Sequence, residues 1–589
     1  MTTGLLVSQI GYDLRAPMRA IWRGALPEGA MFRLQDESGQ TLLEKPLVFW
    51  GTCWGSDWWI ADFSELTTAG TFTLTLEGPG FPTVTCPPFN VGEYHLWHST
   101  VKTVAIEQFE RRAELARFGN GWKDCGGDWR EVGSHTAALI GLLDLLHIGL
   151  EWLGRADGLR LARQVMHGCD YLVLCQQRAA DLGWPTGAVV HEIPNHPVLI
   201  PQDQGQFVVA LAKASRYIYE LDRERGLDYL NRAAAAYEFL TQKCQPSSLP
   251  HFSAQLHGVP EGYLPSPLNP LPKGEGDSAL PPLPPGEGPG VRADDEGSGV
   301  RKTGFMTADL LMMVWGAVEL AKSGRPEYLE EAIRRADQIL SRQVTREAPE
   351  GEFYGHFYAF DDHLFTEKAF LHHHVGHDTS LMFNHYLVPL LDLCDLLPEH
   401  PDQPRWRQAV RDFAYGYFLP ACQKNPFYLL PQGYYAGQGL LSFCGPWHGF
   451  NVCYGYAAAQ AIRFEMAFGD PAFRPIAVGN LQWICGLNAG LTSDSFEGSV
   501  MWREQLPEGK AIPYSFIEGI GANSVKTWSR IPGSIGNGLC TNRQFYMEVE
   551  PTVENDIPCR YSDEDWIPHA GGFLSGLVHL RMLMNWSPK

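Results

Sequence analysis

The first 92 residues alternate apolar and polar positions in short runs that glycine, proline and aspartate separate. Leu5–Ile10 (LLVSQI) and Gly70–Glu77 (GTFTLTLE) are two such runs. Because successive side chains of a strand point to opposite faces of a sheet, a period of two residues predicts β-strands. Several short strands with turn residues between them predict a small β-sandwich over residues 1–92.

From about residue 93 the apolar positions recur with the longer period of an amphipathic helix, for example over Thr136–Leu153 and Phe207–Glu220. This period predicts about a dozen helices. They are expected near residues 95–116, 133–155, 157–177, 203–223, 227–243, 305–323, 326–345, 376–397, 405–418, 448–468, 472–485 and 571–585. Such a set of antiparallel helices suits two concentric rings, so we expect residues 93–589 to form an all-α (α/α)6 barrel.

One segment inside the helical part differs in composition. Between residues 259 and 302 the sequence is rich in proline, glycine and acidic residues, and it nearly repeats itself at Leu268–Gly276 and Leu280–Gly288. Proline interrupts helix and sheet hydrogen bonding, and the segment has little apolar surface to offset its ordering entropy. We expect a disordered surface insertion; a proline-rich docking motif is the alternative.

Composition narrows the class of ligand. Hydrophobic residues make up 44% of the 589 residues and charged residues 19%, which is typical of a folded enzyme with a sizeable core. The formal net charge of −21 would repel phosphate backbones and anionic lipid, so nucleic acid and membranes are not expected partners. The 18 tryptophans and 22 tyrosines favour a neutral ligand such as a sugar, because aromatic faces stack on sugar rings.

The N-terminal residues and the cysteines bear on location. No basic segment followed by an apolar run opens the sequence, and the 13 cysteines are scattered without paired spacing. These features predict a cytoplasmic protein with reduced thiols, or a secreted protein if a leader has been removed. The sequence does not predict an oligomeric state.

Two aspartates lie in a glycine-rich stretch directly before a predicted helix, in GWKDCGGDW at Gly121–Trp129. Glycines allow a tight turn that can bring Asp124 and Asp128 to one water molecule. Mutual repulsion and partial burial would separate the pKa values of the two carboxyls, so that one can act as a base. The alternative is a structural role, in which an aspartate caps the helix.

A second acidic group lies far along the chain, in YSDEDWIPHA at Tyr561–Ala570, before the last predicted helix. Glu564 lies between two aspartates and close to Trp566. Neighbouring negative charge and an apolar wall raise a carboxyl pKa, as a general acid near neutral pH requires. Acidic residues also favour a helix N-terminus through its dipole, so the pattern alone leaves both roles open.

The chain resembles glycoside hydrolase family 9, in the branch with an N-terminal immunoglobulin-like domain. Matching segments follow one another in the family's order along most of the chain. They are Leu6–Tyr12, Asp57–Ser64, Phe89–Val91, Gly121–Asp128, Asp170–Gln177, Gln206–Ser215, Gly449–Asn451, Gly486–Asn488 and Tyr561–Ala570. The resemblance implies an immunoglobulin-like β-sandwich, an (α/α)6 barrel, and hydrolysis of β-1,4-linked glucan or cello-oligosaccharides.

The resemblance also implies the catalytic roles. Asp128 would be the base, Asp124 would help to hold the attacking water, and Glu564 would be the general acid of an inverting hydrolase. Acid and base in such enzymes flank the scissile bond about 6.5–9.5 Å apart. This chemistry requires no cofactor, and structural calcium stays open because oxygen ligands leave weak sequence signals.

Further side chains are candidates for binding the sugar. Aromatic rings can stack on it, and imidazole or guanidinium groups can donate to its hydroxyls. The candidates are Trp122, Trp129, His373, Trp447, His448, Tyr454, Trp502, Arg503 and Trp566. His373 belongs to HHHVGHD at His372–Asp378, for which a metal cluster is the alternative.

The sequence departs from the family pattern at three places. The two aspartates are four residues apart rather than three, Met501–Arg503 is the nearest replacement for a Pro-His-His-Arg motif, and His569 stands where the family has asparagine. Two alternatives stay open. The lack of a visible signal peptide favours an intracellular exo-acting β-glucosidase or glucosaminidase, and the shifted aspartate loop would suit a catalytically inactive carbohydrate-binding protein on the same scaffold.

Overall fold

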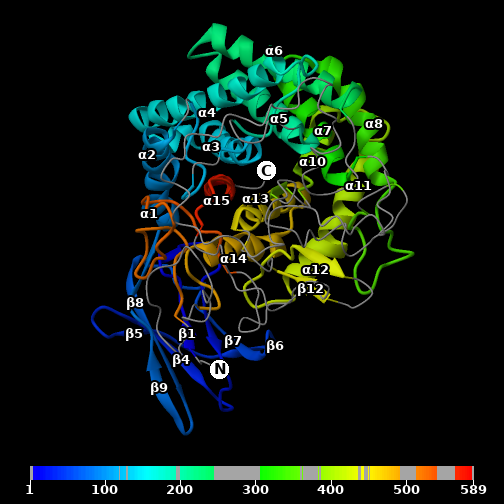
Figure 1. The fold of residues 1–589 in the computed structure, drawn as a ribbon. Helices are drawn as coiled ribbons and strands as arrows, with labels where there is room; N and C mark the ends of the chain where they lie inside the picture. The colour runs from blue at the N-terminus through cyan, green and yellow to red at the C-terminus, as the bar shows by residue number, and fades with distance from the viewer. Residues whose placement is uncertain are drawn as a thin grey trace, which may run out of the picture.

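The computed structural model describes residues 4–117, 120–127, 130–193, 199–244, 305–358, 361, 382–383, 386–435, 440–443, 449, 451–490, 512–539 and 564–586. Figure 1 shows a β-sandwich formed by the N-terminal part of the chain and a larger body of helices. The predicted insertion at residues 259–302 and the first part of the helix predicted at residues 376–397 lie outside the described residues.

The sandwich consists of two sheets. One has the strand order β1-β3-β7-β6 and the other β2-β10-β8-β4-β5, with β9 paired to β8. The strands are β1 (Gly4–Leu6), β2 (Tyr12–Asp13), β3 (Arg19–Arg23), β4 (Met31–Asp36), β5 (Thr41–Pro46), β6 (Val48–Cys53), β7 (Ser56–Asp62), β8 (Gly70–Gly78), β9 (Phe81–Thr85) and β10 (Phe89–Gly92). The alternation in β8 buries Phe72, Leu74 and Leu76, which confirms the period of two as the signal of a half-buried strand.

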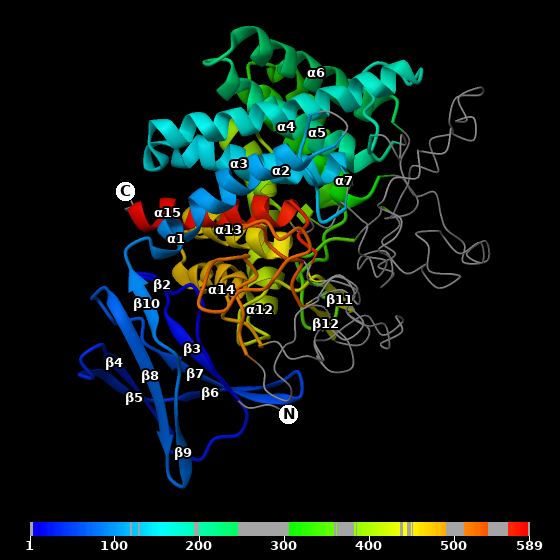
Figure 2. The same ribbon diagram turned by 60° about the vertical axis from the view of Figure 1, so that its left-hand side comes forward.

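Six of the described helices form a closed inner ring, in which α3, α5, α7, α10, α13 and α15 each contact the next and α15 contacts α3. These are α3 (Val132–Leu153), α5 (Pro201–Ile218), α7 (Thr307–Lys322), α10 (Val388–Leu396), α13 (Asn451–Phe468) and α15 (Pro568–Asn585). Around them lie α1 (His95–Lys102), α2 (Gln108–Leu115), α4 (Arg155–Asp181), α6 (Arg223–Gln242), α8 (Leu329–Leu340), α11 (Gln403–Phe413), α12 (Leu419–Cys422) and α14 (Arg474–Ile484). This arrangement is the predicted (α/α)6 barrel (Figures 1 and 2).

Short elements connect several of these helices. A π-helical turn at Thr103–Glu107 joins α1 to α2, so the helix predicted over residues 95–116 is found in three pieces. A second π-helical turn, Ala414–Phe418, joins α11 to α12. Single 3-10 turns precede α8 and α14, at Pro326–Tyr328 and Pro471–Phe473, and β11 (Gly433–Tyr435) pairs with β12 (Leu440–Ser442).

Glycines bring α15 close to two neighbouring helices. A Cβ atom on Gly571 would lie 2.3 Å from the carbonyl oxygen of Ala137 in α3, and one on Gly572 would lie 2.3 Å from that of Val452 in α13. Neither distance leaves room for a side chain. The Gly-Gly pair therefore allows α15 to lie between α3 and α13. The position of α15 in turn determines the position of residues 564–567, which lead into it.

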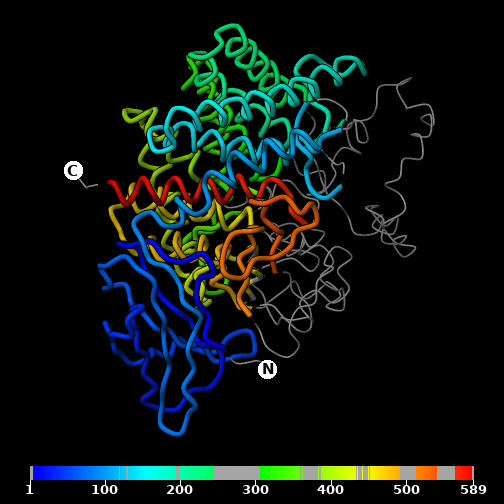
Figure 3. The backbone as a smooth tube through the Cα atoms, turned by 90° about the vertical axis from the view of Figure 1, so that its left-hand side faces the viewer, coloured from blue at the N-terminus to red at the C-terminus, as the bar shows by residue number. Residues whose placement is uncertain are grey.

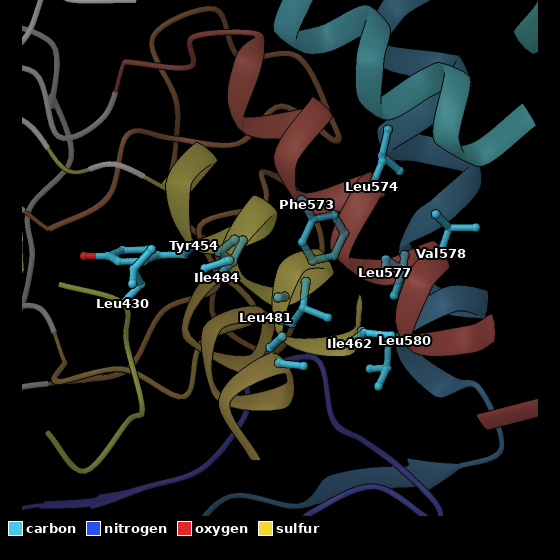
Figure 4. Close-up of a cluster of buried hydrophobic side chains, with 14 of the residues drawn as sticks. Leu430, Tyr454, Ile462, Leu481, Ile484, Phe573, Leu574, Leu577, Val578 and Leu580 are labelled. Atoms are coloured by element: carbon cyan, nitrogen blue, oxygen red, sulfur yellow. The ribbon is translucent and has the colours of Figure 1, made fainter. Parts of the chain in front are cut away.

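Apolar side chains of α13, α14 and α15 form one continuous part of the core (Figure 4). Ile462, Leu481, Ile484, Phe573 and Leu577 are all buried there. The helix α3 is long and apolar enough to cross a membrane, but most of it is buried inside the barrel. An inner-ring helix has protein on every side, so it needs apolar residues around most of its circumference.

Charged side chains connect neighbouring helices of the inner ring. The ion pairs are Lys213–Asp144, Arg216–Glu319, Lys322–Asp392 and Arg463–Asp392, and Ser575 Oγ donates to Asp144. These contacts link α3, α5, α7, α10, α13 and α15. We call this set of side chains the ion-pair ring.

Trp54 joins the sandwich to the barrel. It lies in the turn between β6 and β7 with a left-handed backbone φ of 50°, and it is only 4% exposed. Its ring stacks on Phe427 with centroids 6.1 Å apart and meets the edge of Phe443 at 5.3 Å. Backbone bonds from Gln9 and Ile10 to the carbonyl oxygen of Cys485 add to the junction. The sandwich is thus packed firmly against the helical part.

Candidate active site

Two segments from distant parts of the chain meet at one end of the inner ring. The aspartate loop (residues 120–127) leads into α3, and the acid segment (residues 564–567) leads into α15. The N–H of Ile567 donates to the carbonyl oxygen of Asp124 over 3.0 Å. Residues 512–539 lie beside the start of α15 (Figure 3), where the N–H of Asn537 donates to the carbonyl oxygen of Glu564 over 2.7 Å.

Arg112 of α2 holds the aspartate loop and the acid segment together. Its buried guanidinium donates through Nη1 to the carbonyl oxygens of Lys123 and Asp124, over 2.8 and 3.1 Å. Through Nη2 it donates to the carbonyl oxygen of Asp565 over 2.8 Å and pairs with the carboxylate of that residue at 2.6 Å. The donor directions of a guanidinium are fixed by its plane, so Arg112 sets the separation of the two segments.

Asp124 is buried, and its two carboxyl oxygens have different surroundings. Oδ2 accepts from Ser134 Oγ over 2.7 Å and from the N–H of Glu131 over 3.3 Å. Oδ1 has no hydrogen-bond partner among the described residues. Burial raises the pKa of Asp124 well above its usual range, and the charge of Glu564 raises it further, although both hydrogen bonds oppose the rise. Oδ1 is therefore free to accept a hydrogen bond from a water molecule.

The carboxyl group of Glu564 has two hydrogen-bond donors. Nδ2 of Asn537 donates to Oε2 over 3.0 Å, and the thiol of Cys125 also bonds to the carboxyl. Burial raises the pKa of Glu564 to about 7, the two hydrogen bonds oppose this rise, and the charge of Asp565 adds to it. A carboxyl with this pKa is largely protonated just below neutral pH and can act as a proton donor.

A second group of buried titratable side chains adjoins Asp124. Oε1 of Glu131 lies 3.8 Å from Nε2 of His191, and Nδ1 of His191 lies 2.6 Å from Oδ2 of Asp203. Burial raises the pKa of Glu131 well above its usual range, and the charge of Asp124 adds to this. Burial alone would lower the pKa of His191, but the charges of Asp203 and Glu131 raise it to about 9. His191 is therefore positively charged at neutral pH and offsets part of the negative charge beside the aspartate loop.

Two aromatic residues predicted to bind sugar belong to the core instead. Trp122 has no exposed surface, and its Nε1 donates to Gln164 over 3.0 Å. Tyr454 is 2% exposed, and its hydroxyl donates to the carbonyl oxygen of Phe443. Neither ring offers a face to a ligand, so the predicted stacking roles of Trp122 and Tyr454 are wrong. Both aromatics fill space between packed elements, which a sequence pattern does not distinguish from lining a cleft.

Trp566, two residues after Glu564, is partly exposed. It stands edge-on to His569, with ring centroids 6.0 Å apart, and packs against buried apolar residues of the inner ring. Trp566 therefore stays a candidate for sugar contact. The other predicted site residues lie outside the described residues: Asp128, Trp129, His373, Trp447, His448, Trp502 and Arg503.

Some residues of the site carry no signal in the sequence. Trp528 lies against the aspartate loop, because a Cβ atom on Gly126 would lie 1.9 Å from its ring. Its ring is partly exposed, which makes Trp528 a further candidate for sugar contact. Arg112 and Asn537 were also not among the site residues predicted from the sequence. Arg112 bonds to Asp565, 453 positions away, and Asn537 bonds to Glu564 and His569, 27 and 32 positions away. No motif or period in the segment of either residue marks it.

Among the described residues, no group of three or more histidine, cysteine, aspartate or glutamate side chains is arranged to hold a metal ion. The cysteines described there are free thiols. The histidine-rich stretch His372–Asp378 lies outside the described residues. The expectations about cofactors and calcium therefore stay predictions.

The chain combines an immunoglobulin-like sandwich with an (α/α)6 barrel, and known proteins share this combination. Residues 2–80 match the family model of the cellulase N-terminal Ig-like domain. A metagenome-derived glycoside hydrolase family 9 endoglucanase has a TM-score of 0.58 at 15% identity, over 98% of this chain and 99% of that one. A search of curated proteins found no match.

Two further solved structures have the same fold. A family 9 glycoside hydrolase from Bacteroides ovatus has a TM-score of 0.57 at 15% identity, with 98% of each chain covered. AaCel9A, solved with a cellobiose-like isofagomine, has a TM-score of 0.54 at 16% identity, over 99% of this chain and 100% of that one. The resemblance to glycoside hydrolase family 9 is thus confirmed at the level of the fold.

Proposed function

We propose that the protein is an inverting glycoside hydrolase that cleaves β-1,4-linked glucan or cello-oligosaccharides. One observation carries the proposal: buried Asp124 and half-buried Glu564 lie close enough for the charge of Glu564 to raise the pKa of Asp124, and the pKa of Glu564 is itself raised to about 7. The fold shared with family 9 endoglucanases supports the same reaction, and the sugar-like ligand of AaCel9A supports a glucan as substrate.

In the proposed reaction, Glu564 donates its proton to the glycosidic oxygen while the bond between that oxygen and the anomeric carbon breaks. The electrons of the broken bond stay on the oxygen. A water molecule attacks the anomeric carbon from the opposite face and gives its proton to Asp128, while Asp124 accepts a hydrogen bond from this water. Attack from the opposite face converts a β-linkage into an α-anomer. The role of Asp128 rests on the family resemblance.

The test compares the wild type with Glu564→Gln on cellulose, cello-oligosaccharides and aryl β-glycosides, with the product anomer followed by NMR. We expect the wild type to release the α-anomer first and the variant to lose about 10²–10⁴-fold in kcat, the usual contribution of a general acid. Product sizes separate endo from exo cleavage. Glu465→Gln, which changes a buried glutamate of α13 paired with Arg474, is the matched control and should keep the activity.

Two results would contradict the proposal. A wild type that binds sugar without cleaving any of these substrates would favour the inactive carbohydrate-binding alternative. A Glu564→Gln variant with the wild-type rate would show that Glu564 is not the acid.

A further inference from the structure

The carboxyl group of Glu564 is the end of a series of hydrogen bonds that begins at the backbone of α13. The N–H of Val452 donates to Nδ1 of His569 over 2.8 Å. Nε2 of His569 lies 2.5 Å from Oδ1 of Asn537. Nδ2 of Asn537 then donates to Oε2 of Glu564 over 3.0 Å. The series joins α13, α15, residues 512–539 and the acid segment.

The first bond determines the direction of the others. A backbone N–H can only donate, so Nδ1 of His569 is an acceptor and the ring proton is on Nε2. Nε2 therefore donates to Oδ1 of Asn537. This bond identifies which end of the amide is oxygen, and it leaves the NH₂ group facing Glu564. The amide thus presents a donor to Glu564, in an orientation that the neutral ring of His569 imposes.

Burial makes this orientation hard to reverse. His569 and Asn537 have no exposed surface. The backbone of Asn537 is held as well, by its bond to the carbonyl oxygen of Glu564 at 2.7 Å and by the N–H of Asn451 at 3.3 Å. Turning the amide over would place its NH₂ group against the donor Nε2 of His569 and its oxygen against Oε2 of Glu564. Facing donor with donor and acceptor with acceptor in a buried site is costly.

We infer that Asn537 and His569 are positioning residues for the general acid, an inference that rests on the proposed role of Glu564. A protonated carboxyl accepts hydrogen bonds best at its carbonyl oxygen. The donor at Oε2 therefore makes Oε2 the carbonyl oxygen and places the acidic proton on Oε1. Asn537 selects the oxygen that gives up the proton, and His569 keeps Asn537 in the required orientation.

The titratable groups around Glu564 come from four elements, and they bear on any pH measurement. They are Asp124 and Cys125 in the aspartate loop, Asp565 in the acid segment, Arg112 of α2 paired with Asp565, and His569 behind Asn537. A variant of Asn537 leaves all of these side chains in place. A change in the pH profile of such a variant therefore reports the loss of the amide donor.

The kinetic test uses Asn537→Leu and His569→Phe, with two aryl cellobiosides that differ in the leaving group. Because the Asn537 bond lowers the pKa of Glu564, its loss should move the basic limb of the kcat profile upward by about one pH unit. We expect kcat for the phenyl glycoside to fall about tenfold, the effect of losing one bond to an ionisable group. The dinitrophenyl glycoside should lose less, since its leaving group departs without a proton.

His569→Phe should also move the basic limb of the kcat profile upward and lower kcat for the phenyl glycoside. Both changes should be smaller than in Asn537→Leu, because Asn537 is still present. Asn488→Ala is the matched control. Asn488 is a buried asparagine that donates to the carbonyl oxygen of Tyr514 in the same 512–539 segment. Its loss should lower thermal stability and leave the pH profile and the leaving-group dependence unchanged.

The outcomes separate this inference from the proposed function. If Glu564→Gln shows the leaving-group dependence of an enzyme without its acid while Asn537→Leu behaves like the wild type, the positioning role is refuted and the proposed function stands. If kcat of Glu564→Gln does not depend on the leaving group in this way, the positioning role and the proposed function are both refuted.

A second measurement does not depend on activity. The ¹⁵N NMR spectrum of labelled histidine, assigned with His569→Phe, reports the tautomer of His569 directly. We expect a neutral ring with the proton on Nε2 and none on Nδ1. A proton on Nδ1 would overturn the inference.

Discussion

Two sets of carboxyls at the inner ring have opposite surroundings. In the segments that lead into α3 and α15, buried Asp124 and half-buried Glu564 have hydrogen-bond donors but no ion pair with lysine or arginine among the described residues, and removal from solvent raises the pKa of both. In the ion-pair ring, Asp144 and Asp392 are buried as well, and burial alone would raise the pKa of each. The lysine and arginine side chains that contact them hold these pKa values below the usual range instead.

The difference shows that burial alone does not decide the charge of a carboxyl in this barrel. A cation at contact distance favours the ionised form and makes the carboxyl part of the structure. Without a cation the carboxyl stays protonated to a higher pH and is available for proton transfer. The contacts of Glu564 and Asp565 differ in the same way, because Arg112 pairs only with Asp565.

The largest expected effect comes from breaking the ion-pair ring. Asp392→Asn leaves the charges of Lys322 and Arg463 without their shared partner, and loss of one member of a buried ion pair costs about 3–5 kcal/mol. Denaturation in urea should show this loss in the free energy of unfolding, with kcat unchanged.

Asp395→Asn is the matched control for this prediction. Asp395 lies 3.7 Å from the same Arg463, but its carboxyl is 68% exposed. An exposed pair contributes about 1 kcal/mol or less, so this variant should be nearly as stable as the wild type. Equal losses of unfolding free energy in Asp392→Asn and Asp395→Asn would contradict the stabilising role given to the ion-pair ring.

The pH dependence of stability should have opposite signs in the two regions. The folded pKa of Glu564 is about 7 against an ordinary 4.5, so its contribution to the free energy of unfolding falls as the pH rises between these values. Glu564→Gln should therefore gain stability over the wild type across this range, by up to about 3 kcal/mol.

The carboxyls of the ion-pair ring have lowered pKa values, so their contribution is present above the ordinary 3.8 and is lost below it. Asp392→Asn should accordingly differ most from the wild type near neutral pH and least in acid. Urea denaturation at several pH values measures both differences. A Glu564→Gln variant whose stability relative to the wild type is the same in acid and at neutral pH would contradict the raised pKa.

The smallest expected effect compares two serines, one in each region. Ser134→Ala removes the hydroxyl that donates to Oδ2 of Asp124, and Ser575→Ala removes the one that donates to Asp144. Asp144 keeps its ion pair with Lys213, whereas Asp124 has no ion pair among the described residues that could replace the bond. Ser134→Ala should cost about 1–2 kcal/mol in unfolding free energy. Ser575→Ala should cost less, and only Ser134→Ala should change the acid limb of the rate profile.

Much of the fold was predictable because long helices carry their burial pattern in the local sequence. The helix predicted at residues 305–323 is found as Thr307–Lys322, and the sandwich follows the alternation of its strands. The π-helical turn that interrupts the first predicted helix was not predictable, because inserting a residue into a helical turn leaves the apolar spacing almost unchanged.

The site was predictable only where motif and neighbouring charge coincide, as at Asp124 and Glu564. The contacts of Arg112 with the aspartate loop and the acid segment depend on which helices are neighbours in the inner ring. The series of hydrogen bonds from His569 to Glu564 depends on this as well. That neighbourhood follows from close packing at glycines such as Gly571, far from any local pattern. The prediction that Trp122 binds sugar was wrong for a related reason, since the identity of an aromatic residue does not tell which way its ring points.

The most direct test of the central claim is the titration of the Glu564 carboxyl by ¹³C NMR, with the resonance assigned by its absence in Glu564→Gln. The account predicts that the Glu564 carboxyl titrates near pH 7 in the folded protein. The pH at which the rate falls on the basic side should agree with that value. A Glu564 resonance that titrates at the ordinary pKa of 4.5 would mean that the buried site does not hold a protonated acid, and the proposed mechanism would be wrong.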